Sequence, residues 1–145
     1  TVTRAPASTS IHGPAQLATL PATDMTEMPD AALTLIALAP LLPGGGEITG
    51  LSSLHHKECD RLECPAEEFK GLGVTAATTH DSIRIHGLGT DGLQAHTLTT
   101  YHDHRMAMAF SILGSVSGTL EVDDKSVVDK TYPAYWQDYA RLIQG

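Results

Sequence analysis

Three short stretches of this 145-residue chain concentrate the residue types that can move protons or hold anions. Carboxylates set among guanidinium and ammonium groups can transfer protons on a substrate that carries negative charge. Lys and Arg total only nine, and four of them fall in or beside these stretches. The residues concerned are Asp30 in residues 24–32, Lys57, Glu58 and Arg61 in residues 55–62, and Arg105 in residues 101–108, with Lys130 downstream.

The carboxylates of the first two stretches allow a structural interpretation beside the chemical one. Asp30 follows Pro29 at the start of an apolar stretch, so it could simply favour a helix dipole by about 0.3–1 kcal/mol. It could equally be a general base for a hydroxyl group. Glu58 and Arg61 share a helical face at i, i+3 and could form a surface pair of about 0–1 kcal/mol. Alternatively, Lys57 and Arg61 hold an anion while Glu58 moves a proton.

Arg105 favours the chemical interpretation by its position alone. It begins the almost wholly apolar segment 105–113, and a cation at a helix N-terminus opposes the helix dipole. An anion held jointly by the guanidinium and the free backbone N–H groups would explain the placement. Lys130 carries no argument by itself, because a lone lysine before Thr-Tyr-Pro is usually solvated.

The eight histidines raise a metal-site alternative. A zinc or iron site could draw on His55, His56, Cys59, His102 and His104. Their spacing is no more specific than His-x-His, and the two groups lie more than forty residues apart. The basic neighbours would also repel a cation, so we rank a metal-dependent enzyme behind the other interpretations.

Composition excludes several classes of protein. Seventeen acidic against nine basic residues give a net charge of −8, which argues against a general nucleic-acid partner. The 41% apolar content allows a packed core. No apolar run approaches the ~20 residues that span a membrane, and the first residues do not resemble a signal peptide. Two cysteines five positions apart make no disulfide framework. We therefore expect a cytoplasmic protein with no membrane partner.

The positioning elements alternate between strand and helix, which predicts an α/β fold. The order reads β-α-β-α-β-β and then β-α-β-α, so the second block lacks its last two strands. Another part of a longer polypeptide would have to supply them. Helix 30–39 is apolar on nearly every face and is expected to be buried all round. The sequence predicts strands at 8–11, 47–51, 74–78, 82–86, 93–99 and 119–122, and helices at 30–39, 65–70, 105–113 and 133–143.

Four motifs in this order resemble the C-terminal part of EPSP synthase, 3-phosphoshikimate 1-carboxyvinyltransferase. They are Met28-Pro29-Asp30-Ala31-Ala32, Lys57-Glu58-Cys59-Asp60-Arg61-Leu62, Asp103-His104-Arg105-Met106-Ala107-Met108 and Lys130-Thr131-Tyr132-Pro133. The upstream residues and Lys-Glu-Cys also resemble the EPSP synthase segment of AROM polypeptides. The resemblance implies an inside-out α/β barrel of the enolpyruvyl transferase type. Residues 1–145 would be a partial C-terminal domain, with one complete unit at about 1–87 and an incomplete one at about 92–145.

The resemblance also implies an activity. The enolpyruvyl group of phosphoenolpyruvate (PEP) moves to the 5-hydroxyl of shikimate 3-phosphate, giving EPSP and phosphate without a cofactor or metal. Two departures are Ser53, where many members have an asparagine at the shikimate phosphate, and His55-His56, where Arg-Val is commoner. The implied roles are catalysis for Asp30, Glu58 and Lys130, PEP binding for Arg61, Arg105 and Lys130, shikimate 3-phosphate binding for Asp30, Lys57 and Ser53, and support from Asp103 and His104.

The family's N-terminal domain, which this chain lacks, would complete the site. This chain alone would then be inactive. A competing interpretation from another class is a non-catalytic interaction module that retains the fold. Such a module would be expected to have lost one or more site residues, and none of the residues named above is lost.

Overall fold

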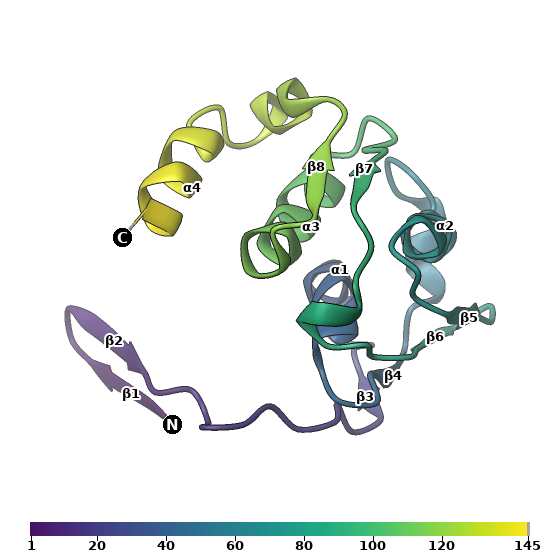
Figure 1. Cartoon of the computed structure of the whole chain (residues 1–145), viewed down its shortest axis with the longest axis horizontal. Helices are drawn as coiled ribbons and strands as arrows, with labels where there is room; N and C mark the ends of the chain where they lie inside the picture. The colour runs from purple at the N-terminus through teal and green to yellow at the C-terminus, as the bar shows by residue number, and fades with distance from the viewer. Residues whose placement is uncertain (145) are drawn as a thin grey trace.

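The structure, a computed structural model, describes residues 1–144. Its strands and helices follow one another along the chain as the predicted alternation requires (Figure 1). The strands are β1 Val2–Ala5, β2 Ser8–Ile11, β3 Thr23–Asp24, β4 Gly46–Thr49, β5 Ala76–Thr78, β6 Ser82–Ile85, β7 His96–Leu98 and β8 Leu120–Val122. The helices are α1 Pro29–Leu38, α2 Glu63–Gly71, α3 His104–Ser117 and α4 Tyr135–Gln144, with 3₁₀ turns η1 Ala39–Leu41, η2 Ser52–His56, η3 Thr90–Gly92 and η4 Lys125–Lys130.

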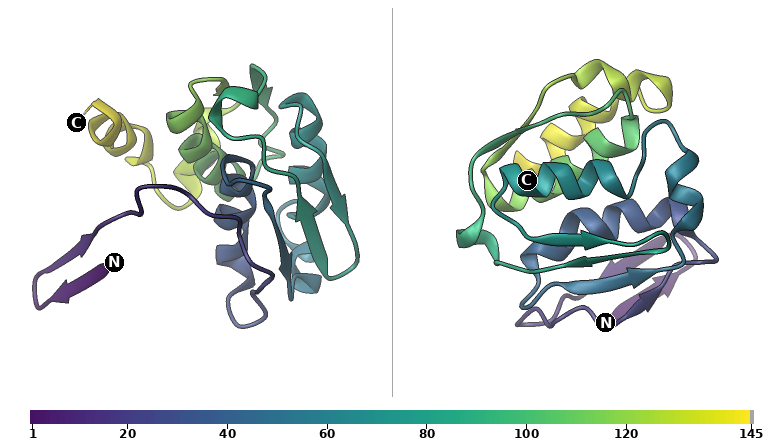
Figure 2. Two further views of the ribbon diagram at one scale, coloured as in Figure 1. Left: turned by 60° about the horizontal axis from the view of Figure 1, so that its bottom comes forward. Right: turned by 90° about the vertical axis from the view of Figure 1, so that its right-hand side faces the viewer.

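The main sheet has four strands in the order β3-β4-β6-β5. β3 runs parallel to β4, and β4, β6 and β5 pair antiparallel. Helices cover one face of this sheet, as the right-hand view of Figure 2 shows. On β6, Ile83 and Ile85 are buried whereas Arg84 is exposed, which is the period of two expected of a half-buried strand. The strands predicted at 74–78 and 82–86 are confirmed as β5 and β6, which form an antiparallel hairpin through His80 and Asp81.

The core lies between the sheet and the helices α1, α2 and α3. Fully buried side chains of α1, including Ala32 and Ile36, contribute to the core cluster. Phe69 of α2 meets Phe110 of α3 with ring centroids 5.6 Å apart. The expectation that helix 30–39 is buried all round is wrong, because Ala31 and Thr34 are exposed on a side that the surrounding elements leave open.

The N-terminal residues differ from the prediction. The strand expected at 8–11 forms, but within residues 1–144 it pairs only with β1, in a hairpin whose residues are all exposed. This hairpin lies away from the main sheet (Figure 1). The strand that precedes α1 in the main sheet is instead β3, which pairs with β4. Two residues are too few to produce a periodic pattern, so the sequence did not indicate β3.

The second block contains β7, α3, β8 and α4, as predicted, with the 3₁₀ turn η4 added. β7 and β8 pair only with each other within residues 1–144, and they run parallel. α3 extends to Ser117, and the next residue, Gly118, is its left-handed C-cap with a φ of 66°. A complete barrel and the unit boundaries stay predictions. No helix in the described part of the chain has the length and apolarity to cross a membrane.

Candidate functional site

One open cavity of about 380 Å³ gathers most of the predicted site residues. They come from the ends of helices and from the loops beside them. Asp30 lies in the first turn of α1, Glu58 in the loop after η2, and Arg105 at the start of α3. Pro29 occupies the first turn of α1, where a missing N–H costs little. The cavity is lined by Asp30, Lys57, Glu58, Arg61, His104, Arg105, Lys130 and Thr131.

Arg61 lies at the centre of the carboxylates of this site and is only 2% exposed. Its Nε donates to Asp103 Oδ2 at 2.7 Å, and its Nη2 donates to Asp103 Oδ1 at 3.1 Å. The same guanidinium donates to Asp30 Oδ1 at 3.1 Å and to Glu58 Oε2 at 2.7 Å. Burial by itself would lower the pKa of Arg61, but these carboxylates outweigh it and the pKa is raised. Arg61 therefore stays charged and joins segments far apart in the sequence.

Asp103 connects the buried Arg61 guanidinium to α3. It is fully buried and is the N-cap residue of the helix, where its Oδ1 accepts the backbone N–H of Arg105 at 2.8 Å. The Cys59 thiol also donates to it at 3.5 Å. One carboxylate thus fixes both the Arg61 guanidinium and the first turn of α3, and the supporting role of Asp103 stays a prediction.

The two carboxylates that line the cavity, Asp30 and Glu58, are each paired with a lysine. Lys57 Nζ lies 3.0 Å from Asp30 Oδ1, and its hydrogen bond is the main reason that the pKa of Asp30 is lowered. Lys130 Nζ donates to Glu58 Oε1 at 2.6 Å. That hydrogen bond lowers the pKa of Glu58 to about 2. Both carboxylates are therefore ionised at neutral pH.

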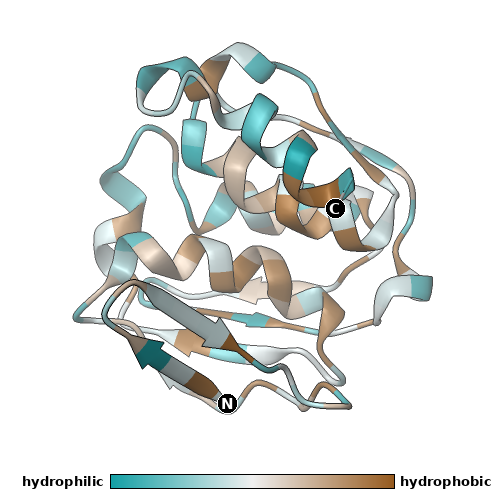
Figure 3. Ribbon diagram, turned by 90° about the vertical axis from the view of Figure 1, so that its left-hand side faces the viewer, coloured by the Kyte–Doolittle hydropathy of each residue, from teal (hydrophilic) through white to brown (hydrophobic). Residues whose placement is uncertain are grey.

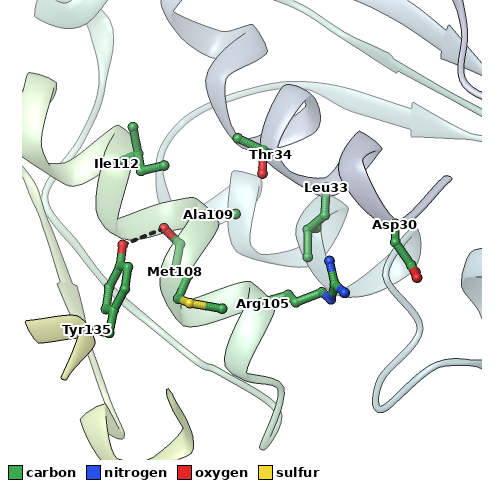
Figure 4. A pocket seen from close by; sticks show the side chains of 8 residues that line it. All are labelled: Asp30, Leu33, Thr34, Arg105, Met108, Ala109, Ile112 and Tyr135. Atoms are coloured by element: carbon green, nitrogen blue, oxygen red, sulfur yellow. Dashed lines mark hydrogen bonds between the residues drawn. The ribbon is translucent and has the colours of Figure 1, made fainter. Parts of the chain in front are cut away.

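Arg105 differs from the other cations of the cavity. Within residues 1–144, its guanidinium forms no ion pair, because no carboxylate oxygen lies within 4.0 Å of it. The side chain is exposed. It also borders a neighbouring groove of about 130 Å³ between α1 and α3. Figure 4 shows Asp30 and Arg105 at one end of this groove and Ile112 and Tyr135 at the other. Arg105 is thus the cation most available to an anionic ligand.

His104 was predicted only as a supporting residue, and it reaches the cavity wall. It is 4% exposed, and its Nδ1 is buried without a hydrogen-bond partner in the described chain. Burial lowers its pKa. Thr131 also lines the cavity. No role was predicted for Thr131, and its place beside Lys130 is the signal that could have indicated one.

Ser53 lies outside this cavity, and of the metal candidates only His104 lines it. Ser53 is exposed within η2. His55 is occupied by Asp60, at 2.8 Å from Nδ1, and by the carbonyl of His80, at 3.0 Å from Nε2. Within residues 1–144, no three His, Cys, Asp or Glu side chains are arranged to hold a metal ion.

Comparison with known proteins places the chain in a family. The sequence profile of EPSP synthase (3-phosphoshikimate 1-carboxyvinyltransferase) matches residues 1–139. The chain belongs to the EPSP synthase family. It is 41% identical to the pentafunctional AROM polypeptide of Schizosaccharomyces japonicus, over 97% of this chain and 10% of that protein. It is 40% identical to the 3-phosphoshikimate 1-carboxyvinyltransferase of Bacteroides fragilis, over 84% of this chain and 30% of that protein.

Solved EPSP synthases share the fold. The structure of the Acinetobacter baumannii enzyme matches with a TM-score of 0.64 and 26% sequence identity, over 78% of this chain and 27% of that one. This match confirms the predicted α/β class. The chain spans less than a third of the length of the relatives that it matches.

Proposed function

We propose that this chain forms part of the active site of an EPSP synthase. The enzyme would transfer the enolpyruvyl group of PEP to the 5-hydroxyl of shikimate 3-phosphate, in the shikimate pathway to aromatic amino acids. The observation that carries the proposal is the convergence of Asp30, Lys57, Glu58, Arg105 and Lys130 on one open cavity. These residues come from separate motifs, and their family roles require them to share one site.

Arg105 and Lys130 would bind the anionic groups of PEP. A free guanidinium can hold a carboxylate or phosphate through two parallel hydrogen bonds, and Arg105 forms no ion pair with a carboxylate within residues 1–144. Arg61 is also proposed to contact PEP, although its guanidinium already binds Asp103, Asp30 and Glu58. Its contact with PEP would therefore replace one of these bonds.

Asp30 and Lys57 would face the reacting hydroxyl of shikimate 3-phosphate. As the hydroxyl oxygen attacks C2 of PEP, its proton would pass to the ionised Asp30 carboxylate, while Lys57 holds that carboxylate in place. Lys57 would also hydrogen-bond the same oxygen. The contact of Ser53 with the phosphate of shikimate 3-phosphate remains a prediction, because Ser53 is not on the cavity wall.

Glu58 and Lys130 would move the proton at the methylene carbon of PEP. Addition requires a proton at that carbon, and elimination of phosphate removes one from the resulting methyl group. The ionised Glu58 carboxylate is suited to removing the proton from the methyl group. The Lys130 ammonium, 2.6 Å away, can supply a proton to the Glu58 carboxylate. Lys130 would also assist the bridging oxygen as phosphate leaves. These steps require no cofactor and no metal.

The remaining substrate contacts would come from the N-terminal domain of the same enzyme. The relatives are at least about three times as long as the matched segment, and positioning between two domains can contribute ~7–11 kcal/mol to barrier lowering. A cytoplasmic location is part of this proposal, in keeping with the two free cysteines.

The test is EPSP formation by the full-length protein that contains this chain. We expect EPSP and phosphate to form in equal amounts from PEP and shikimate 3-phosphate. Mass spectrometry measures the EPSP, and a phosphate assay measures the phosphate. Treatment with a chelator should leave the rate unchanged. A folded full-length protein that makes no EPSP, or one that loses activity with the chelator, would refute the proposal.

A further inference from the structure

Glu68 is a buried carboxylate that lies outside the cavity. It lies in the second turn of α2, on the buried side of the helix, and it is only 4% exposed. Burying a carboxylate is costly unless hydrogen bonds compensate for the lost water. Its bonds therefore indicate what the residue does in the fold.

Within residues 1–144, the side-chain hydrogen bonds of Glu68 all lead to one short segment. Its Oε2 lies 2.7 Å from His96 Nε2 and accepts the backbone N–H of Thr99 at 3.0 Å. Its Oε1 accepts the hydroxyl of Tyr101 at 2.7 Å. One side chain of α2 thus binds three residues within six positions, on β7 and on the connection from β7 to α3.

This connection contains an unusual backbone turn. Tyr101 and His102 have φ values of 53° and 58°, and no other non-glycine residue of the described chain has a positive φ. Left-handed backbone is disfavoured for residues with a Cβ atom, and it persists where the surroundings over-determine it. The Asp103 N–H donates to the Thr100 carbonyl at 2.9 Å, and the Thr100 N–H donates to Asp123 at 3.0 Å. Glu68 adds the side-chain bond from Tyr101.

The turn leads directly into the site. The next residue, Asp103, holds Arg61 through two hydrogen bonds and caps α3. His104 and Arg105 follow, and both line the cavity. A change in the direction of the turn would therefore move the Asp103–Arg61 pair and the free guanidinium of Arg105 together.

We propose that Glu68 is a positioning residue for the PEP subsite, which it serves by holding Tyr101 in the left-handed turn that places Asp103 against Arg61 and Arg105 on the cavity wall. The kinetic part of this inference rests on the proposed function. The structural part does not, because it concerns only the order of the segment from Thr99 to Arg105.

The structural part is tested by hydrogen exchange in the full-length protein. Glu68→Gln changes one acceptor oxygen into a donor, and Tyr101→Phe removes one hydroxyl with little change of volume. The matched control is Glu67→Gln, on the same helix, where the side chain is 61% exposed and pairs with exposed Lys70. We expect faster exchange at residues 99–105 in both test variants and no change in the control. Unchanged exchange in Tyr101→Phe, the milder variant, would overturn the inference.

The kinetic part separates positioning from mere stability. A variant that is partly unfolded loses kcat in proportion to the inactive fraction and keeps its KM. Misplacement of Arg105 instead raises the KM for PEP. For Tyr101→Phe we expect kcat/KM for PEP to fall on the order of 10-fold, mainly through KM, since a shift of about 1 Å can cost 10²-fold.

The outcomes distinguish the two proposals. Faster exchange with an unchanged KM for PEP would make Glu68 a structural residue only and overturn the positioning role. A wild-type protein without EPSP-forming activity would refute the proposed function, while the exchange result would still decide whether Glu68 holds the turn.

Discussion

The guanidinium of Arg61 donates hydrogen bonds to three carboxylates that lie up to 42 residues away in the sequence. Its charge is thereby committed within the protein. The charge of Arg105, by contrast, faces the cavity without a partner in residues 1–144. Two arginines with the same predicted role thus have different surroundings, and their substitution should have different consequences.

Arg105→Ala should weaken PEP binding more than it slows the chemical step. The variant removes a free guanidinium from the cavity and leaves the buried Asp103–Arg61 pair intact. In steady-state assays of the full-length enzyme we expect a rise in the KM for PEP, with a smaller change in kcat. Arg141→Ala, on exposed α4, is the control and should change neither constant. A kcat that falls while KM stays constant would contradict the binding role.

Glu58→Gln should act on kcat instead. The amide cannot take up a proton, and proton-transfer groups typically contribute ~10²–10⁴-fold to the rate. We expect a fall in kcat of that order, while PEP binding survives in part when measured by calorimetry. Asp30→Asn should behave alike, and Lys130→Ala should change both constants. If Glu58→Gln retained the wild-type kcat, the assigned proton transfer would be wrong.

Elements decide where these side chains lie, and the start of α3 has the largest effect. Asp103 is at once its N-cap and the partner of Arg61. A helix that began one residue later would lose both interactions. The N-terminal end of α3 is therefore fixed by a contact with another segment as well as by local capping.

Asp103→Ala should destabilise the protein strongly. Removing one partner of a buried ion pair leaves an uncompensated charge and costs about 3–5 kcal/mol. Asp124 is the matched control, because it caps η4 through the Ser126 N–H at 2.8 Å without a buried cation. Its alanine variant should cost about 1 kcal/mol. Urea unfolding of the full-length variants measures both, and similar costs for the two would argue against the buried pair.

The contact between η2 and the start of α2 should depend on pH. His55 binds Asp60, whose Oδ1 accepts the first N–H groups of α2, and Glu63 lies nearby. The hydrogen bond with Asp60 raises the pKa of His55 above 6.5. The stabilisation is thus fully present below pH 6.5 and is lost as the pH rises through the raised value.

His55→Ala should therefore lower the free energy of unfolding more at pH values below 6.5 than above the raised value, while activity stays nearly unchanged. His56→Ala, on the exposed neighbour, is the control. Unfolding midpoints measured across this range give the result. An equal loss at every pH would show that the ion pair contributes nothing, and loss of activity would favour the metal-site alternative.

The whole molecule leaves apolar surface without a partner in the described chain. Ile112 and Val116 of α3 and Leu142 and Ile143 of α4 are exposed. Figure 3 shows the apolar positions of these helices on the face toward the viewer. A groove of about 470 Å³ between α3, β8 and α4 is lined by apolar and aromatic side chains, among them Trp136 and Tyr139, and by the polar residues Ser111, Glu121 and Lys125. Exposed patches of this kind and unpaired strand edges favour association.

The isolated chain should therefore associate and should not catalyse the reaction. We expect dimers or larger species at micromolar concentration, measured by light scattering, and no phosphate release above a heat-treated control. Addition of the N-terminal domain should restore activity. A monomer with a sharp unfolding transition would contradict the missing-strand interpretation, and turnover by the chain alone would contradict the division of the site.

The sequence by itself determined the family and the α/β class, and its motifs contain most of the residues that line the cavity, because the motifs are local and keep their order. It also predicted the strands at 74–78 and 82–86 and, from His80 and Asp81, the turn between them. Tertiary structure alone decided that Asp103 binds Arg61, that Glu68 binds Tyr101, and that β3 rather than β2 joins the main sheet. The physical reason is that periodicity and turn residues report the local backbone and its buried face. They do not identify which distant group will satisfy a buried charge, and a two-residue strand exists only through its neighbour.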